Sequence, residues 1–167
     1  AYDWLDDELN VRPVEPDVIG GNGGLMARGA GALGFDGRVI ERIENGCQGS
    51  CRCLQGCPHG AKLSMERSLL PRATSNGARI LSEARVDKIT HRGSRATGVI
   101  GRLARSNKRF TIHATGGVVL AASATGTPAL MRRSGLRRGG VGDHFQAHPG
   151  CGIAGVFDEE VRPWAGA

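Results

Sequence analysis

Four cysteines within eleven residues form the densest group of reactive side chains in this sequence. They are Cys47, Cys51, Cys53 and Cys57, and Cys151 lies far from them along the chain. Thiols this close together can hold an iron–sulfur cluster or zinc. Their spacing, C-x3-C-x-C-x3-C, lacks the C-x2-C pair common at zinc sites, and an odd number of cysteines argues against a disulfide framework. The pattern favours structural thiols and leaves a cluster, zinc or a disulfide open.

A glycine-rich stretch matches the letters of a dinucleotide-binding fingerprint, because Gly29–Gly34 reads G-x-G-x-x-G. That fingerprint requires a strand before the glycines, a helix after them, and an acidic residue about 20 positions further on for the ribose. Here Leu25–Arg28 is not a strand pattern, Phe35–Gly37 is typical of a turn, and position 54 has no acidic neighbour. The stretch therefore predicts the end of a helix rather than a nucleotide site.

Two histidines, His144 and His148, are spaced so that they could share one face of a helix and hold a metal. Pro149 would end such a helix at once, and no glutamate follows His144 as it does in metalloproteases. We interpret both histidines as polar loop residues. The acidic run Asp158–Glu160 is interpreted in the same way, as a solvated turn.

The chain is basic, with 22 Lys and Arg against 16 Asp and Glu, a net charge of +6. Only three of the basic residues are lysines, the arginines are scattered, and aromatic residues make up 4% of the chain, too few for a base-stacking surface. These features argue against nucleic acid as a partner. The one dense basic cluster is interpreted as a solvated helix end rather than a phosphate site, and it consists of Arg132, Arg133, Arg137 and Arg138.

The elements that would position these residues differ between the two halves of the chain. The 167 residues fit one domain, at roughly 100–200 residues per domain, and suffice for a hydrophobic core. Prolines and paired glycines predict an extended segment over residues 1–21. The first half is further predicted to contain a helix over 22–33 with Asn22 as N-cap, a loop over 45–61, and a helix over 64–75 that Ser64 caps and Pro71 kinks or divides.

The second half has the pattern of short strands. Residues 79–89, 96–103 and 109–113 predict an antiparallel meander. The apolar run 118–122 does not alternate, which predicts a strand buried on both faces, as in a parallel sheet. A turn over 123–127 then leads to a helix that ends near Arg133, with Pro128 in its first turn and Gly135 at its C-terminal cap. A strand, tight turn and helix N-terminus would present backbone N–H groups to an anionic cofactor.

Several segments in this order resemble the glucose–methanol–choline (GMC) oxidoreductases, a family of FAD-dependent enzymes that oxidise alcohols. Ser123–Leu136 is similar to the second signature of the family, although Ser123 stands where glycine is more frequent and Arg137 where the signature ends in glycine. Cys53–Ser64 resembles a family motif in the form seen in the bacterial and long-chain-alcohol-oxidase-like branch. The other similar segments are residues 22–34, Gly77–Ile89 and Val141–Pro149.

The resemblance implies an α/β fold: part of a doubly wound FAD-binding domain with an antiparallel β-meander. The family's N-terminal βαβ unit and its active-site histidine have no counterpart here, so the resemblance implies a central fragment that is inactive alone. It implies three regions. They are 1–61, an extended leading segment with a short helix and the Cys/Gly-rich loop; 62–142, the FAD-binding part with the meander; and 143–167, the start of a substrate-binding domain.

The resemblance also implies a function and a set of site residues. The function is oxidation of a small-molecule alcohol by hydride transfer to N5 of FAD, with no catalytic residue in this chain, no membrane span and a cytoplasmic location. The alternative is a small iron–sulfur or zinc-binding module built on the four clustered cysteines. The residues implied to contact FAD are Val86, Ala122, Ser123, Ala124, Thr127, Pro128, Gly142 and Asp143.

Overall fold

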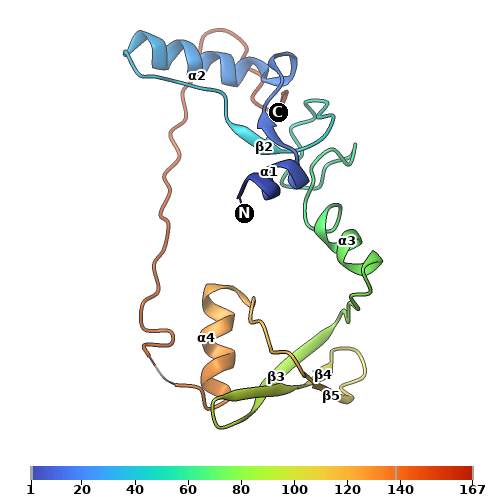
Figure 1. Ribbon diagram of the computed structural model, residues 1–167. Helices are drawn as coiled ribbons and strands as arrows, with labels where there is room; N and C mark the ends of the chain where they lie inside the picture. The colour runs from blue at the N-terminus through green and yellow to red at the C-terminus, as the bar shows by residue number, and fades with distance from the viewer. Residues whose placement is uncertain (1, 138, 167) are drawn as a thin grey trace. The chain divides into compact units, whose positions relative to one another are not determined.

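The computed structural model describes residues 2–137 and 139–166 (Figure 1). The chain divides into two compact units. Unit 1 is Ala1–Arg79 with Ile153–Ala167, and unit 2 is Ile80–Gly152. In the described part of the chain, no helix is long and apolar enough to cross a membrane.

Unit 1 is mostly helix and loop around one small sheet. Its helices are α1 (Tyr2–Leu9), the short 3₁₀ helix η1 (Pro16–Val18), α2 (Gly20–Ala32) and α3 (Leu69–Ser75). Strand β1 (Val11–Pro13) pairs antiparallel with β2 (Glu41–Ile43), which joins segments about 30 residues apart in the sequence. Leu9, Val14 and Ala61 are the apolar residues buried in the described part of this unit.

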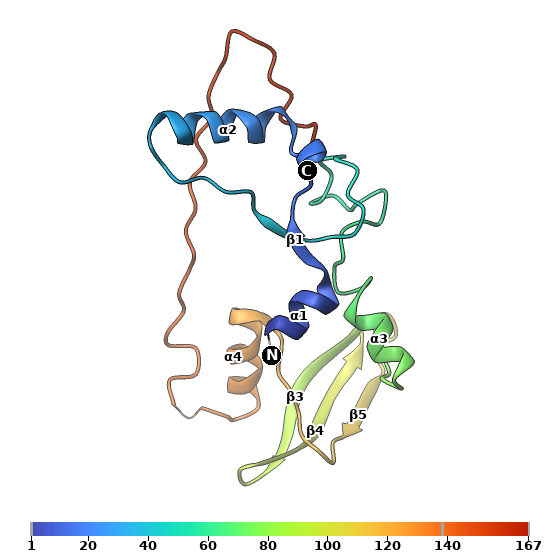
Figure 2. The same cartoon turned by 45° about the horizontal axis from the view of Figure 1, so that its top comes forward.

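Unit 2 is a three-stranded antiparallel meander with one helix. Strands β3 (Ala84–Arg92), β4 (Arg95–Leu103) and β5 (Arg109–His113) lie side by side in sequence order, as Figure 2 shows. Gly93, at φ +57°, lies in the two-residue turn between β3 and β4. The pairing of β3 with β4 shifts between Val86 and Lys88, so Asp87 is bulged out of the ladder.

Helix α4 (Ser123–Arg133) packs against the outer edge of β3. The N–H of Ile89 donates to Ser134 Oγ at 2.8 Å, and Ile89 and Leu130 are both buried. The helix ends as the sequence predicts, because Gly135 has φ +82° and the next N–H, of Leu136, donates to Met131 O. This Schellman ending allows the chain to turn sharply after the helix. The packing satisfies a backbone donor of β3 that an unprotected edge strand would expose.

The meander and the first-half loop confirm the sequence predictions, whereas several element boundaries were wrong. Residues 1–21 were predicted to be extended but contain α1, β1 and η1. The predicted 22–33 helix exists, but it begins at Gly20, so Asn22 lies inside it rather than capping it. The predicted 64–75 helix begins only at Leu69, after a series of turns, which places Pro71 in its first turn, where a missing N–H is harmless.

Two predictions for the second half were also wrong. Residues 118–122 form no strand, since they pair with neither named sheet of the described chain, and both of those sheets are antiparallel. Val119 is accordingly 93% exposed rather than buried on both faces. Helix α4 begins at Ser123, so Pro128 lies in its interior rather than its first turn. The apolar core is correspondingly small, since only Ile89 and Leu130 of the described apolar residues of unit 2 are buried.

Candidate functional site

The start of α4 is held by side chains that bond to its own backbone. Thr127 Oγ1 accepts the N–H of Ala122 at 3.0 Å, and Ser123 Oγ accepts the N–H of Gly126 at 3.3 Å. Ser123 has φ +68°, in the left-handed region that favours glycine. These contacts fix a sharp turn into the helix, whose first-turn N–H groups have no partner within the helix.

A glycine-containing loop packs against the side of α4. Gly142 has φ +82°, and a Cβ atom built on it would lie 3.1 Å from Pro128 Cβ and 3.4 Å from Arg132 Nε. Arg132 Nε donates to Val141 O at 2.8 Å, and its guanidinium forms an ion pair with Asp143. Arg132 therefore joins this loop to the helix. Arg132 and Arg133 are exposed in the last turn of α4, in agreement with the predicted solvated helix end, and Arg132 also holds this loop. Arg138 of that cluster lies outside the described residues.

Helix α4 and the loop enclose an open hollow of about 760 Å³ in unit 2. Its walls combine apolar atoms of Pro128, Met131 and Phe145 with the backbone at the helix start. Free N–H donors at a helix N-terminus beside an apolar wall suit a ligand with anionic and aromatic parts, as FAD has. The residues present therefore fit a flavin nucleotide. The lining residues are Ala124, Thr125, Thr127, Pro128, Ala129, Met131, Arg132, Gly140, Val141, Gly142, His144, Phe145 and Gln146.

The structure brings together most of the residues for which the sequence predicted FAD contacts. Ala124, Thr127, Pro128 and Gly142 line the hollow. Ala122, Ser123 and Asp143 adjoin it through the hydrogen bonds and the ion pair given above. Val86 lies on β3 opposite Gly101 and does not line it.

The residues His144, Phe145 and Arg132 belong to the walls of the hollow, and sequence reasoning did not assign them there. His144 was interpreted correctly as a loop residue, but its position beside Gly140, with Nε2 3.2 Å from where a Cβ would lie, was not foreseen. The available signal was the set of glycines at 139, 140 and 142, all with positive φ, because such a loop can fold closely onto a neighbouring helix.

The cysteine loop of unit 1 is a second group of chemically reactive residues. All five cysteines of the chain are free thiols, and no group of three or more His, Cys, Asp or Glu side chains among residues 2–137 and 139–166 is arranged to hold a metal ion. The structure thus gives no support to the iron–sulfur or zinc hypothesis. Cys53 Sγ accepts a hydrogen bond from Arg42 at 3.0 Å, and Cys51 Sγ donates to Pro163 O at 3.4 Å.

Cys57 differs from the other cysteines in its surroundings. The backbone N–H of Lys62, with smaller contributions from those of His59, Gly60 and Ala61, stabilises the thiolate and lowers the pKa of the Cys57 thiol below its ordinary value. The lowered pKa increases the fraction of Cys57 that is thiolate near neutral pH, and the thiolate is the nucleophile.

We expect iodoacetamide to alkylate Cys57 at least about threefold faster than Cys151 at pH 7. Cys151 is exposed and shows no such ring of donors, so it serves as the reference within the same molecule. Mass spectrometry of peptides quenched over time, at several pH values, would give both rates. The rise in the Cys57 rate is expected to have its midpoint below the pH that is ordinary for a cysteine thiol, and a midpoint at or above that pH would contradict this prediction.

The comparisons with known proteins define the class of protein to which these units belong. The family model described as "GMC oxidoreductase" matches residues 1–150. The chain belongs to the GMC oxidoreductase family.

The relatives show how large a share of such a protein this chain represents. An uncharacterized GMC-type oxidoreductase of Mycobacterium tuberculosis is 42% identical over 167 residues, 98% of this chain and 26% of that protein. One from Sinorhizobium fredii is 38% identical over 87% of this chain and 29% of its own length, and a long-chain-alcohol oxidase of Arabidopsis thaliana is 26% identical over 86% and 20%. The chain therefore spans about a quarter of the length of the relatives it matches. No solved structure matches.

Proposed function

We propose that the intact protein is an FAD-dependent oxidoreductase that oxidises the CH–OH group of an alcohol. Family membership supports oxidoreductase activity and FAD as its cofactor. The alcohol substrate is supported by the names of relatives, which include long-chain-alcohol oxidases and a 2-methyl-1,2-propanediol dehydrogenase. We further propose that residues 62–142 contribute to the FAD-binding domain and that 143–167 begin the substrate-binding domain.

The main structural support for the proposal is the contact between two segments of unit 2. Two segments predicted to contact FAD from separate parts of the sequence, 122–128 and 142–143, lie against each other around one hollow. Residues without a shared role need not meet in this way. In this proposal Gly142 allows the loop to approach α4 closely, and Ser123 and Thr127 hold the helix start so that its free N–H groups face the cofactor.

Bound FAD supplies the redox chemistry by accepting a hydride from the alcohol carbon. The residues of this chain position the cofactor and hold none of the reacting protons. A positioning role agrees with the walls of the hollow, in which backbone donors, small residues and a loop held against α4 predominate.

The proposal is tested on the full-length protein. We expect it to purify with a bound flavin that acid releases as FAD, and the flavin absorbance to bleach when a primary alcohol is added without oxygen. A series of alcohols of increasing chain length would define the substrate class. A protein that purifies without flavin and takes up none when FAD is supplied, or whose flavin no alcohol reduces, would overturn the proposal.

Arg132→Gln is expected to weaken FAD binding by at least about tenfold while changing the free energy of unfolding by less than about 1 kcal/mol. The exposed ion pair contributes little to stability, but its loss frees a glycine-containing loop that binding would then have to order. Fluorescence titration of the deflavinated full-length protein with FAD measures the change. Arg105→Gln is the matched control, since it breaks an exposed ion pair with Glu83 away from the hollow, and equal losses in both variants would refute the positioning role of Arg132.

A further inference from the structure

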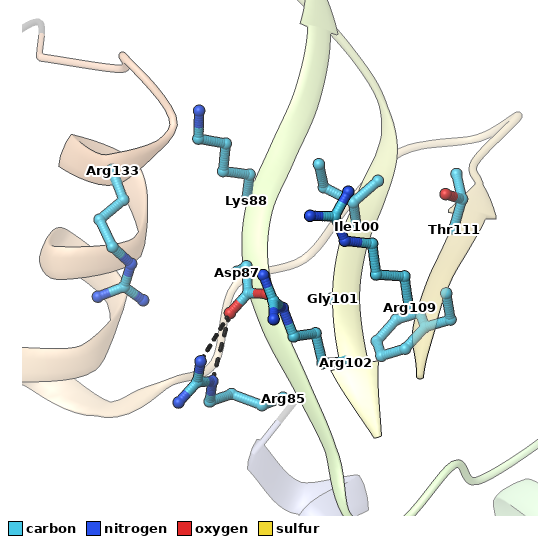
Figure 3. Close-up of a pocket in the computed structure, with 10 residues that line it drawn as sticks. Arg85, Asp87, Lys88, Ile100, Gly101, Arg102, Arg109, Thr111 and Arg133 are labelled. Atoms are coloured by element: carbon cyan, nitrogen blue, oxygen red, sulfur yellow. Dashed lines mark hydrogen bonds and ion pairs between the residues drawn. The ribbon is translucent and has the colours of Figure 1, made fainter. Parts of the chain in front are cut away.

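The β3–β4–β5 sheet carries a row of three arginines that the site described above does not use. The register places Arg85 opposite Arg102, and Arg102 opposite Arg109. Directly opposite residues point to the same face of a sheet, so the three side chains share one face. Lys88 of β3 and Arg133 of α4 border the same open hollow, whose volume is about 790 Å³ (Figure 3). We name this feature the arginine groove, after its basic residues Arg85, Lys88, Arg102, Arg109 and Arg133.

The charges of the arginine groove are not balanced. Asp87 is the one acidic residue among its lining residues, and it already forms ion pairs with two arginines. Its Oδ1 lies 3.2 Å from an Arg85 guanidinium nitrogen, and its Oδ2 lies 3.4 Å from Arg102 Nε. Lys88, Arg109 and Arg133 form no ion pair with any residue that the structure describes. Five positive groups against one carboxylate leave a formal excess of four positive charges.

This arrangement costs stability unless an anion fills it, because like charges placed directly opposite on neighbouring strands repel. Guanidinium groups bind phosphate through paired N–H donors, which makes arginine the usual residue for phosphate recognition. The Thr111 hydroxyl adds another polar group, and Ile100 contributes an apolar surface between the basic residues. The volume of about 790 Å³ lies within the range of small-molecule sites, roughly 300–1,000 Å³.

The geometry also bears on the kind of anion. Three arginines on three adjacent strands span two interstrand spacings, about 10 Å, which is wider than one phosphate group. Nucleic acid fits poorly, because Phe110 is the one aromatic residue among those that line the groove, too few for base stacking. A small ligand with two linked phosphates would contact the whole row.

We propose that the arginine groove binds a diphosphate group of a small ligand. This proposal does not rest on the proposed oxidoreductase function, because the groove is defined by its own residues. The same chemistry could come from a free diphosphate-bearing molecule or from the diphosphate of the cofactor itself, and the experiment separates these sources.

The test uses the full-length protein, with its flavin where it carries one, and inorganic pyrophosphate as the probe. Calorimetric titration is expected to detect binding that weakens as ionic strength rises. The double variant Arg102→Gln/Arg109→Gln should lose at least tenfold in affinity. The double variant Arg95→Gln/Arg105→Gln removes the same charge outside the groove and should bind as the wild type does.

A variant that is expected to strengthen binding separates the loss of a binding residue from a folding defect. Asp87→Asn removes the one lining carboxylate and should bind pyrophosphate severalfold more tightly, which a damaged fold cannot imitate. If the Arg102/Arg109 variant keeps its flavin, the ligand is a separate molecule; if it loses flavin in parallel with pyrophosphate binding, the groove holds the diphosphate of the cofactor. No pyrophosphate binding to the wild type, or equal losses in the two double variants, would overturn the proposal.

Discussion

Replacing Gly101 with valine is expected to lower the free energy of unfolding of unit 2 by about 3 kcal/mol or more. Gly101 is buried in the middle of β4, between Val86 and Phe110 of the flanking strands. A Cβ atom built there would lie 2.2 Å from Arg85 O and 2.6 Å from Phe110 Cζ. The phenyl ring can rotate away, but the carbonyl belongs to the sheet, so the ladder between β3 and β4 must distort. The arginine groove and the position of Val86 would be disturbed with it.

The matched control is Gly116→Val. A Cβ atom at Gly116 has no heavy atom within 4 Å, and its φ lies outside the left-handed region, so we expect a change of less than about 0.5 kcal/mol. Urea unfolding of the full-length protein, followed by circular dichroism and by flavin release, would compare the two variants. Similar unfolding midpoints for both variants would contradict the prediction, because they would mean that a side chain at position 101 can be accommodated between β3 and β5.

The meander could be predicted from the sequence because its signals are local. The three runs contain β-branched residues such as Val86, Ile89 and Val99, and short turns containing Gly93 or Asn107 separate them. The ends of α2, α3 and α4 were similarly readable, since each is followed by a glycine with positive φ, at positions 34, 77 and 135.

Helix α1 was missed because contacts distant in sequence hold it. Arg72 of α3 lies 5.3 Å from the centre of the Trp4 ring and forms an ion pair with Glu8. The local sequence, by contrast, has only one apolar residue buried, Leu9, and prolines soon follow. A charged helix of eight residues is marginal alone, so its stability could not be deduced from residues 2–9.

The candidate site was predictable only in part for a similar reason. Motif resemblance supplied the segments 122–128 and 142–143, but nothing in the sequence indicated that Arg132 holds Val141 and Asp143. Neighbouring arginines of α4 in fact have different surroundings: Arg132 lines the hollow beside the helix and Arg133 lines the arginine groove. Successive helical residues point about 100° apart, so one helix can serve both places. The sequence predicted that these arginines lie at a solvated helix end, but it could not show that they line two different hollows.

Glu44 is expected to be as important for unit 1 as Gly101 is for unit 2. It is the one polar residue buried in the described part of the chain, with an exposed fraction of 4%. Its Oε2 accepts the N–H of Cys47 at 2.7 Å, its Oε1 lies 3.6 Å from Arg12 Nε, and its backbone carbonyl accepts a hydrogen bond from Asn10. The residue therefore joins the start of the cysteine loop to β1 and to the turn after α1.

Glu44→Ala is expected to lower the free energy of unfolding by about 3 kcal/mol, because it leaves the Cys47 N–H without an acceptor and the Arg12 guanidinium without its ion-pair partner. This loss lies at the lower end of the range expected for breaking a buried ion pair, since the Arg12 side chain is 38% exposed and remains partly hydrated. Glu44→Gln retains an amide oxygen for the Cys47 N–H and should cost only about 1 kcal/mol. Glu41→Ala, at an exposed position of β2 three residues before Glu44, is the control. Faster alkylation of Cys47 in Glu44→Ala would show that the loop has been released, whereas equal unfolding midpoints for the Glu44→Ala and Glu41→Ala variants would mean that Glu44 does not anchor it.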